Sequence, residues 1–285
     1  PFITRSYGAS ELLSVFIEVI FENFLIKRSA FSTVLFNTVM WLASLFASLY
    51  MTLSAAAPAP IINIFFFLRE KFLFSISFIN PMPSVEYKNI FLSSILPLVV
   101  EANLNILEDR KKLCKAIKVN NYQLKDEIAK KYFIDLSKIE EISIDTTLKR
   151  IVDIVPVSLV MAQAAVESGW GTSRFALEGN ALFGQWTWDK SKGIEPQNAS
   201  DTKAAVRKFE TLNDSIVAYM INLNTHKAYS SMRSKRKRDC DQNNLISGYE
   251  LANWMGNYAI TRDEYIKTLR LVIKKNKLDL LDSLI

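Results

Sequence analysis

The sequence predicts a mainly helical α+β domain that follows an N-terminal hydrophobic segment. Apolar residues recur at helical spacing through much of the chain after residue 84, and the best candidate for a strand is residues 203–209. Residues 29–68 contain no charged side chain. With 285 residues, of which 49% are hydrophobic, the chain can form one substantial core and still carry this additional segment.

Changes in composition divide the chain into four parts. Residues 1–28 are an N-terminal extension that need not begin at the native start, and residues 29–68 are a hydrophobic anchor or signal segment. Residues 69–84 form a linker, and residues 85–285 form a globular domain. The last boundary rests on Asn80-Pro-Met-Pro-Ser84, where two prolines disfavour a continuing helix.

The hydrophobic segment contains the strongest targeting signal of the chain. Residues 31–53 are long and apolar enough to span a bilayer. Lys27 and Arg28 precede them, which favours a cytoplasmic N-terminus and an exported remainder. The small residues 54–60 resemble a signal-peptidase site, so a membrane anchor and a cleaved signal both fit. We therefore expect a location in the cell envelope, either anchored in the inner membrane or exported.

Helical spacing and capping residues define the expected elements of the globular domain. Pro97 opens or kinks the first helix, and the charged run from Glu108 ends it. Helices are expected at residues 90–107, 122–133 and 146–154, and another is expected to begin at residue 156. A further helix is expected to begin at a cap on Asn213 or Asp214, and two more are expected to begin at capping boxes at residues 247–250 and 261–264. Residues 180–188 are expected to form a groove-lining loop beside a small β lobe that contains residues 203–209.

The net charge of +6 suits an anionic partner such as cell wall, membrane surface or nucleic acid. The basic run at residues 233–238 lacks the interleaved aromatics of a nucleic-acid site, so we interpret it as a solvated loop between helices. Cys114, Cys240 and the single histidine, His226, are too few for a Cys/His zinc cluster. We expect two isolated buried thiols, no metal, no cofactor and no nucleic-acid partner.

Glu167 is the candidate for acid chemistry. Pro156 suits the first turn of an apolar helix, and Gly169 or Gly171 can supply a left-handed C-cap. Glu167 then lies in the last turn, where the helix dipole disfavours negative charge and apolar neighbours such as Trp170 disfavour it further. Both effects raise its pKa, and an acid still protonated near neutral pH can protonate a leaving glycosidic oxygen. A solvated glutamate at a helix end is the structural alternative.

The motif that begins at Glu167 is part of a longer pattern. Glu-Ser-Gly-Trp-Gly-Thr-Ser, starting there, is followed by Gly-Asn-Ala-Leu-Phe-Gly-Gln-Trp at residues 179–186, and the pair resembles the signature of bacterial glucosaminidase-domain hydrolases. Residues 206–219 and 222–229 resemble the Bax-type branch of that family. The resemblance implies a lysozyme-like fold and cleavage of the N-acetylglucosamine-containing glycan strands of peptidoglycan.

The resemblance covers roughly residues 85–277 and also implies where a second carboxylate belongs. In this family it lies on the small β lobe after the Asn-Leu-Phe-Gly-like motif, which here leaves Glu195, Asp201 and Glu210. We choose Glu195 as base or nucleophile, because the Gly-Ile-Glu-Pro sequence around it has the pattern of a strand edge. If no second carboxylate lies near the acid, the N-acetyl oxygen of the substrate can assist instead.

Five further residues are predicted to contact sugar. The rings of Phe183, Trp186 and Tyr258 can stack on pyranose rings, although Phe183 also fits a core position. The amides of Asn180 and Gln185 can hydrogen-bond hydroxyl or acetamido groups. Tyr258 lies in an Asn-Tyr-Ala sequence that, followed by Thr261 and Tyr265, resembles the family's tyrosine-containing segment facing the catalytic glutamate.

These interpretations predict a membrane-anchored or exported peptidoglycan hydrolase, an endo-β-N-acetylglucosaminidase with Glu167 as general acid. Its partners would be the glycan strands of peptidoglycan and, through the N-terminal segment, the membrane. Two alternatives stay open. One is a lytic transglycosylase on the same fold, which leaves an anhydro-sugar end; the other is a catalytically weak wall-binding module whose groove only holds glycan.

Overall fold

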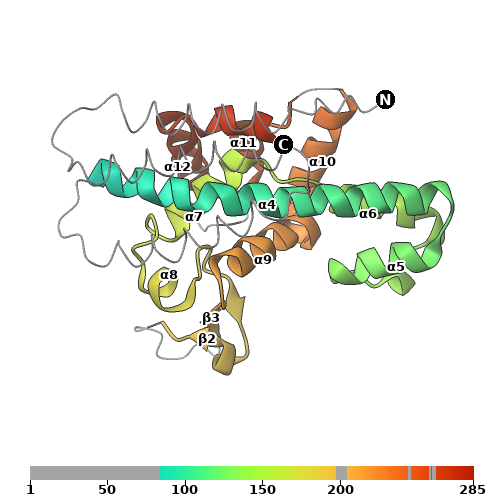
Figure 1. Ribbon diagram of the computed structural model, residues 1–285, viewed down its shortest axis with the longest axis horizontal. Helices are drawn as coiled ribbons and strands as arrows, with labels where there is room; N and C mark the ends of the chain where they lie inside the picture. Colours follow the sequence, from blue (N-terminus) through green and yellow to red (C-terminus); the bar gives the residue numbers. More distant parts are fainter. Residues whose placement is uncertain (1–83, 197–203, 243–244, 257, 259–260) are drawn as a thin grey trace, which may run out of the picture. The chain divides into compact units, whose positions relative to one another are not determined.

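The computed structural model describes residues 84–196, 204–242, 245–256, 258 and 261–285 (Figure 1). The chain divides into two compact units, Pro1–Ser93 and Ser94–Ile285, and the second contains almost all of the described residues. The expected N-terminal extension and hydrophobic segment, and the expected linker up to residue 83, lie outside the described residues.

Helix α4 (Ser84–Lys118) is longer than the sequence predicts. The expectation that the charged run from Glu108 ends it is wrong, and Pro97 lies inside the helix. The charges occupy only part of the helix surface, while Leu113 and Ala116 continue the buried stripe with no exposed area. Because the apolar spacing persists on one face, packing keeps the chain helical through a polar stretch.

Helix α4 also contains a stretch, Tyr87–Lys118, that is long and apolar enough to cross a membrane by length and composition. A buried helix of a soluble core passes the same test, and half of its most apolar window is buried. Asn103 is fully buried and exchanges two hydrogen bonds with the backbone of Val155, at 2.9 and 3.0 Å. A polar side chain satisfied by a distant loop indicates that this part of α4 packs as a core helix of the domain.

The helices of the first half of the domain follow α4. They are α5 (Tyr122–Lys131), the 3-10 turns η1 (Leu136–Lys138) and η2 (Glu141–Ser143), α6 (Ile144–Ile151), α7 (Val157–Glu167) and α8 (Arg174–Gly179). Helices α5 and α6 confirm the predicted helices near residues 122–133 and 146–154. Their apolar side chains form one core cluster with α4: Leu113, Ile128, Ala129, Tyr132, Leu136, Ile144, Leu148, Ile151 and Val152.

A small antiparallel sheet follows α8. Its strands are β1 (Trp186–Thr187), β2 (Gly193–Ile194) and β3 (Ala205–Arg207), in the order β1-β3-β2, with the 3-10 turn η3 (Lys190–Lys192) between β1 and β2. Val206 pairs with Trp186 on one side and with Ile194 on the other. The strand predicted at residues 203–209 is confirmed at its centre. Gly193 is required by this packing, since a Cβ there would lie 2.5 Å from that of Ala205.

The C-terminal part is helical again. It contains α9 (Leu212–Thr225), η4 (Lys227–Tyr229), α10 (Ser230–Asp241), α11 (Gly248–Leu251), η5 (Ala252–Trp254), α12 (Arg262–Lys275) and η6 (Leu278–Leu284). In Figure 1 the strands and α8 lie at one edge of the domain, α11 and α12 lie at the opposite edge, and α7 and α9 run between them. The mainly helical α+β architecture with a small β lobe is confirmed.

The caps of these helices differ in part from the prediction. Helix α9 is capped by Thr211, which forms a complete capping box with Asp214, and neither Asn213 nor Asp214 is the N-cap. Ser247 caps α11 as expected, accepting a hydrogen bond from the Glu250 backbone nitrogen. Thr261 precedes α12 but makes no side-chain cap, so that predicted capping box is wrong.

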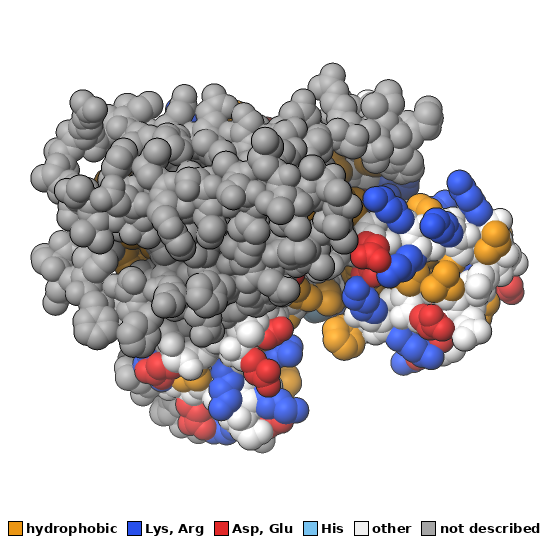
Figure 2. All heavy atoms as spheres, in the orientation of Figure 1, with side chains coloured by type: hydrophobic (Ala, Val, Ile, Leu, Met, Phe, Trp, Pro, Cys, Tyr) orange, Lys and Arg blue, Asp and Glu red, His pale blue; other side chains and the backbone are white. Residues whose placement is uncertain are grey.

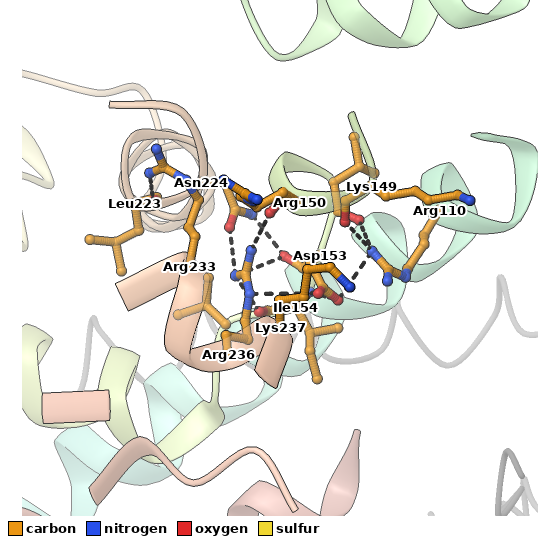
Figure 3. Close-up of polar contacts among 12 residues, drawn as sticks. Arg110, Lys149, Arg150, Asp153, Ile154, Leu223, Asn224, Arg233, Arg236 and Lys237 are labelled. Atoms are coloured by element: carbon orange, nitrogen blue, oxygen red, sulfur yellow. Dashed lines mark hydrogen bonds and ion pairs between the residues drawn. The ribbon is translucent and has the colours of Figure 1, made fainter. Parts of the chain in front are cut away.

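The basic run forms part of α10 and is not the solvated loop that the sequence suggested. Arg236 is fully buried, and its guanidinium donates to the carbonyls of Arg150 (2.9 Å) and Ile154 (2.7 Å) and to Asn224 Oδ1 (2.7 Å) (Figure 3). Arg233, one turn earlier, donates to the Leu223 carbonyl at 2.9 Å. The run therefore has an inward-facing side that sequence composition alone does not reveal.

Asp153 supplies the negative charge beside this buried guanidinium. Its carboxylate lies 3.6 Å from Arg236 Nε and 3.4 Å from Arg110 of α4. Arg110 also donates to the carbonyls of Lys149 (2.8 Å) and Val152 (2.6 Å) (Figure 3). Both arginines thus meet the C-terminal end of α6, where free carbonyls and the helix dipole favour a cation. This network joins α4, α6, α9 and α10.

The described areas of the face drawn in Figure 2 carry charges of both signs and no single basic patch. Figure 2 shows Lys and Arg side chains interspersed with Asp and Glu over the two described areas that this face exposes. Several of these charges form pairs at helical spacing, such as Lys112 with Glu108 and Lys130 with Asp126. Such pairs keep the surface solvated and contribute little to stability.

Candidate active site

Glu167 is the last residue of α7, as the sequence predicts, and its side chain is half-buried. Apart from Ser158 and Gln163, the helix that carries it is apolar, and all residues from Val157 to Ala165 are buried. Burial raises the pKa of the Glu167 carboxyl, and a hydrogen bond from Tyr265 opposes part of that rise. The negative end of the helix dipole acts in the same direction as burial. Glu167 is therefore a carboxylic acid that holds its proton more tightly than usual.

The chain leaves α7 through a turn that explains the glycines of the motif. Gly169, Trp170 and Gly171 all have positive φ, at 58°, 60° and 81°. Ser168 fixes this turn, because its hydroxyl donates to the Ala164 carbonyl at 2.6 Å and accepts from the Gly171 nitrogen at 2.7 Å. Only glycine adopts positive φ without cost, so two glycines flank a Trp170 that bears the strain. The turn ends the helix abruptly and leaves Glu167 at its edge.

Four tyrosines from separate elements surround the Glu167 carboxyl: Tyr219 of α9, Tyr229 at the end of η4, Tyr258 after η5, and Tyr265 of α12. Burial raises the pKa of each phenol, and the charge of Glu167 raises it further in all four. The pKa of Tyr229 rises to about 12. These hydroxyls consequently stay protonated over the working range of an enzyme, so the groups near the acid are neutral phenols.

A chain of hydrogen bonds leads into Glu167. The Tyr219 hydroxyl donates to Gln163 Oε1, and Gln163 Nε2 donates to the Tyr265 hydroxyl oxygen at 2.8 Å. The Tyr265 hydroxyl in turn acts on the Glu167 carboxyl, whose pKa it lowers. Gln163 lies one turn before Glu167 on α7 and is fully buried. Helices α7, α9 and α12 thus converge on one carboxyl group.

The aromatic rings around this chain of hydrogen bonds stack in pairs. Phe183 stacks on Tyr219 with centroids 3.8 Å apart, and Tyr258 stacks on Tyr265 at 5.6 Å. The Tyr258 hydroxyl donates to the Phe183 carbonyl at 2.6 Å, which joins Tyr258 to the loop before β1. Phe183 is only 2% exposed. Its ring supports the tyrosines from the core, which is the alternative that the sequence left open for Phe183.

The remaining predicted sugar contacts lie on α8 and the sheet lobe. Asn180 ends α8 with a positive φ of 52°, and its amide donates to the carbonyls of Phe209 and Glu210. Both of its amide hydrogens therefore hold the chain after β3. Gln185 Oε1 is a buried acceptor that lacks a hydrogen-bond partner among the described residues. Trp186 is 59% exposed and can offer its ring to a sugar.

Glu195 lies on the outer side of this lobe. Its side chain is 63% exposed and pairs with Lys190 at 3.0 Å, and its carbonyl accepts a hydrogen bond from Arg174. Within the described part of the chain, burial and the Tyr265 hydrogen bond alone shift the pKa of Glu167, so no neighbouring carboxylate acts on it. Glu210 is exposed beside the Thr211 cap, and Asp201 lies outside the described residues. The structure thus brings Glu167 and Tyr258 together but leaves Glu195 apart.

Comparison with known proteins identifies the domain. Residues 146–278 match the sequence model of the Glucosaminidase family, described as mannosyl-glycoprotein endo-beta-N-acetylglucosaminidase. The chain is also 37% identical over 164 residues to Protein bax of Escherichia coli strain K12. Residues 146–278 thus form a glucosaminidase-type domain, and the chain is similar to Protein bax. The alignment covers 54% of this chain and 58% of the length of that relative. No solved structure gives a significant match.

The glucosaminidase domain has a lysozyme-like fold, which agrees with the helical body and small sheet of this chain. The family match contains α7 with Glu167, the sheet lobe and all four tyrosines that surround the carboxyl. The whole cluster around Glu167 is therefore part of the glucosaminidase domain.

Three residues of this cluster were not predicted from the sequence: Gln163, Tyr219 and Tyr229. Gln163 does carry a sequence signal, since it is a polar residue four positions before Glu167 in a helix that is apolar apart from Ser158. No comparable signal marks Tyr219 and Tyr229, because their spacing fits ordinary helical core positions.

The described residues do not form a group of metal ligands. In the described segments, no three His, Cys, Asp or Glu residues are grouped as a metal site would need. Cys114 and Cys240 are free and half-buried. His226 uses its Nδ1 atom to accept a hydrogen bond from the Ala228 nitrogen, and it thereby caps η4.

Proposed function

We propose that the chain is a peptidoglycan hydrolase that cleaves β-1,4 glycosidic bonds next to N-acetylglucosamine, with Glu167 as general acid. The observation that carries the proposal is the setting of Glu167. It is a half-buried carboxyl at a helix C-terminus, ringed by four neutral tyrosines and within a glucosaminidase-family domain. No other carboxyl group of the described site shares this combination of access and raised pKa.

The chemistry requires a proton at the right atom. A glycosidic oxygen is a poor leaving group until an acid protonates it, and the acid must still hold a proton at the working pH. Burial keeps the proton on Glu167 above the usual range for glutamate. The Tyr265 hydroxyl then stabilises the carboxylate that forms when the proton leaves.

The second group of the reaction is also a proposal. Glu195 can serve as base only if the β2 edge moves, because its carboxylate now faces solvent and Lys190. Assistance by the substrate's acetamido oxygen requires no second protein carboxylate and fits the present arrangement. For substrate contacts we propose the Trp186 ring, the free acceptor of Gln185 and the Tyr258 side chain, with Asn180 in a supporting position.

One observation favours a second candidate, a lytic transglycosylase. Such an enzyme uses a single acid/base group, and Glu167 has no carboxylate partner in the part of the chain that the structure describes. The 6-hydroxyl of the substrate would then attack the anomeric carbon while the glycosidic oxygen leaves with the proton from Glu167. The Glu167 carboxylate would take up the proton of that hydroxyl, and the product would carry an anhydro end. The two candidates share the acid and differ only in what attacks the sugar.

Product analysis separates these candidates. Sacculi are incubated with the full-length chain, and the released fragments are examined by mass spectrometry, with Glu167→Gln as the matched inactive control. Fragments with free reducing N-acetylglucosamine ends support the glucosaminidase. Anhydro ends support the transglycosylase, and binding without any fragments would show a wall-binding module and overturn the proposal.

We further propose that the domain works in the cell envelope, held to the inner membrane or exported through residues 29–68. This rests on the apolar composition of that segment, and peptidoglycan, its proposed substrate, lies on the same side of the membrane as the exported domain. Separation of cell fractions, followed by detection of the full-length chain, tests this placement. Recovery of the whole chain in the cytosol would contradict it.

A further inference from the structure

Gln163 is an unusual residue in its place. It lies inside α7, is fully buried, and the other buried residues of that helix are small or apolar apart from Ser158, which binds Asp282 at the opposite end. A buried amide is costly unless its polar atoms are satisfied, and an apolar side chain of similar volume would fill the same space. The amide therefore needs a reason beyond packing.

The hydrogen bonds of Gln163 have a fixed direction. A phenol hydroxyl carries one proton, and Tyr219 gives its proton to Gln163 Oε1. The amide nitrogen then points at Tyr265 and donates to the Tyr265 oxygen at 2.8 Å. Because that oxygen is already an acceptor, the Tyr265 proton is directed to its other partner, Glu167. The orientation of one amide thus decides which way the last hydrogen bond runs.

We propose that Gln163 is a positioning residue that orients the Tyr265 hydroxyl as a donor to Glu167. The proposal rests on the proposed role of Glu167 as general acid. Gln163 itself does not touch the substrate and acts only through Tyr265. With this orientation the site favours the carboxylate that forms on proton transfer; with the amide reversed or removed, that stabilisation is lost.

The groups near Glu167 are uncharged, so the interaction with the Tyr265 hydroxyl has a large influence on its pKa. They are Tyr219 from α9, Tyr229 from η4, Tyr258 after η5 and Tyr265 from α12, and all four are neutral phenols. No ionised side chain of the described residues adds to them at Glu167. Burial raises the pKa of Glu167 and the Tyr265 hydrogen bond lowers it, so loss of the bond raises the pKa further.

The test follows the Glu167 carboxyl directly and does not depend on turnover. The full-length chain is labelled with ¹³C at the glutamate side-chain carboxyl, and the Glu167 signal is assigned by its absence in Glu167→Gln. Its titration is then compared in Gln163→Leu, Tyr265→Phe and the double variant. We expect Gln163→Leu and Tyr265→Phe each to move the midpoint upward by about one pH unit, in keeping with loss of a hydrogen bond to the charged form.

The double variant decides whether Gln163 acts through Tyr265. In the Tyr265→Phe background, Gln163→Leu should add no further shift, because the hydroxyl that it orients is gone. Gln123→Leu, an exposed amide on α5, is the matched control and should leave the midpoint unchanged. If Gln163→Leu does not fold, Tyr219→Phe replaces it, since loss of the Tyr219 proton frees the amide to reverse.

The outcomes separate this proposal from the proposed function. An unchanged midpoint in a folded Gln163→Leu chain, or a full additional shift in the double variant, overturns the positioning role. A shifted midpoint in a chain that cleaves no glycan supports the positioning role and removes the catalytic one. In an active chain, the alkaline limb of turnover should move upward together with the carboxyl midpoint, a change that mere loss of stability would not produce.

Discussion

The carboxylate of Asp282 accepts hydrogen bonds from both the backbone nitrogen (2.8 Å) and the hydroxyl (2.7 Å) of Ser158, a residue 124 positions earlier. It also accepts one from the Gly248 nitrogen at 2.8 Å. Ser158 lies in the first turn of α7, so a C-terminal side chain supplies the cap that Pro156 cannot provide. The C-terminal segment therefore holds the helix that carries Glu167.

We predict that Asp282→Ala lowers the free energy of unfolding by about 3 kcal/mol, because it leaves buried donors of Ser158 and Gly248 unsatisfied. Urea denaturation followed by circular dichroism measures the change. Asp279→Ala, which removes only a surface pair with Lys274, is the control and should cost less than about 1 kcal/mol. Equal effects of the two substitutions would contradict the capping role.

The sequence was sufficient for those features that are local. The position of Glu167 at a helix end follows from a proline, an apolar run and two glycines within a few residues, and the structure reproduces it. The strand near Val206 was found for the same reason. Such signals depend on backbone geometry that neighbouring residues dictate.

Features that depend on distant contacts were not predictable in this way. Tyr219 and Tyr265 meet Gln163 across 56 and 102 residues, and no spacing rule links them. The basic run was misread for a related reason, since Arg236 faces inward only because the end of α6 and Asp153 lie there. Phe183 was assigned to the groove, yet a stack on Tyr219 buries it. In each case the partner, and not the residue itself, decides the role.

The buried arginine gives a second stability prediction. Arg236→Met should lower the free energy of unfolding by about 3 to 5 kcal/mol, because Asp153 keeps only Arg110 and the partly buried carbonyls of Arg150 and Ile154 lose their donor. Arg238→Met, on the exposed side of the same helix, should change it by less than about 0.5 kcal/mol. Chemical denaturation of both variants checks the difference. A small effect of Arg236→Met would mean that the network contributes no net stability.

For Glu167→Gln we predict at least about a hundredfold loss of glycan cleavage, the usual cost of removing a general acid. Folding and glycan binding should persist, because glutamine has the same shape and can still accept the Tyr265 hydrogen bond. Turnover on purified sacculi and co-sedimentation with them provide the two measurements. Retention of more than a few per cent of the rate would exclude Glu167 as the acid.

The pH dependence should follow from the raised pKa of Glu167. Only the protonated acid is active, so turnover should fall as pH rises through that pKa, with a midpoint above the ordinary value of 4.5. The contribution of Glu167 to stability changes with pH in the same direction as turnover. The folded state binds the proton more tightly than the unfolded state, so the stability of the wild type relative to Glu167→Gln should decrease as pH rises from about 4.5 through the raised pKa. Unfolding of both chains across this range tests it.

Glu195→Gln is predicted to slow glycan cleavage less than Glu167→Gln does. Glu167 is fixed by a helix and by Tyr265, whereas Glu195 is exposed and paired with Lys190, so its position can change when substrate binds. If Glu195 is the base, the acidic limb of the pH profile should disappear in Glu195→Gln alone.

The measurement is the pH dependence of turnover on a defined glycan for both variants, with Glu178→Gln as a control for loss of an exposed carboxylate beside Arg174. An unchanged rate and profile in Glu195→Gln would remove Glu195 from the mechanism. Asp201 and the acetamido oxygen of the substrate would then remain as the second group. A substrate whose acetamido group is replaced by hydroxyl separates these two, because only substrate assistance requires that group.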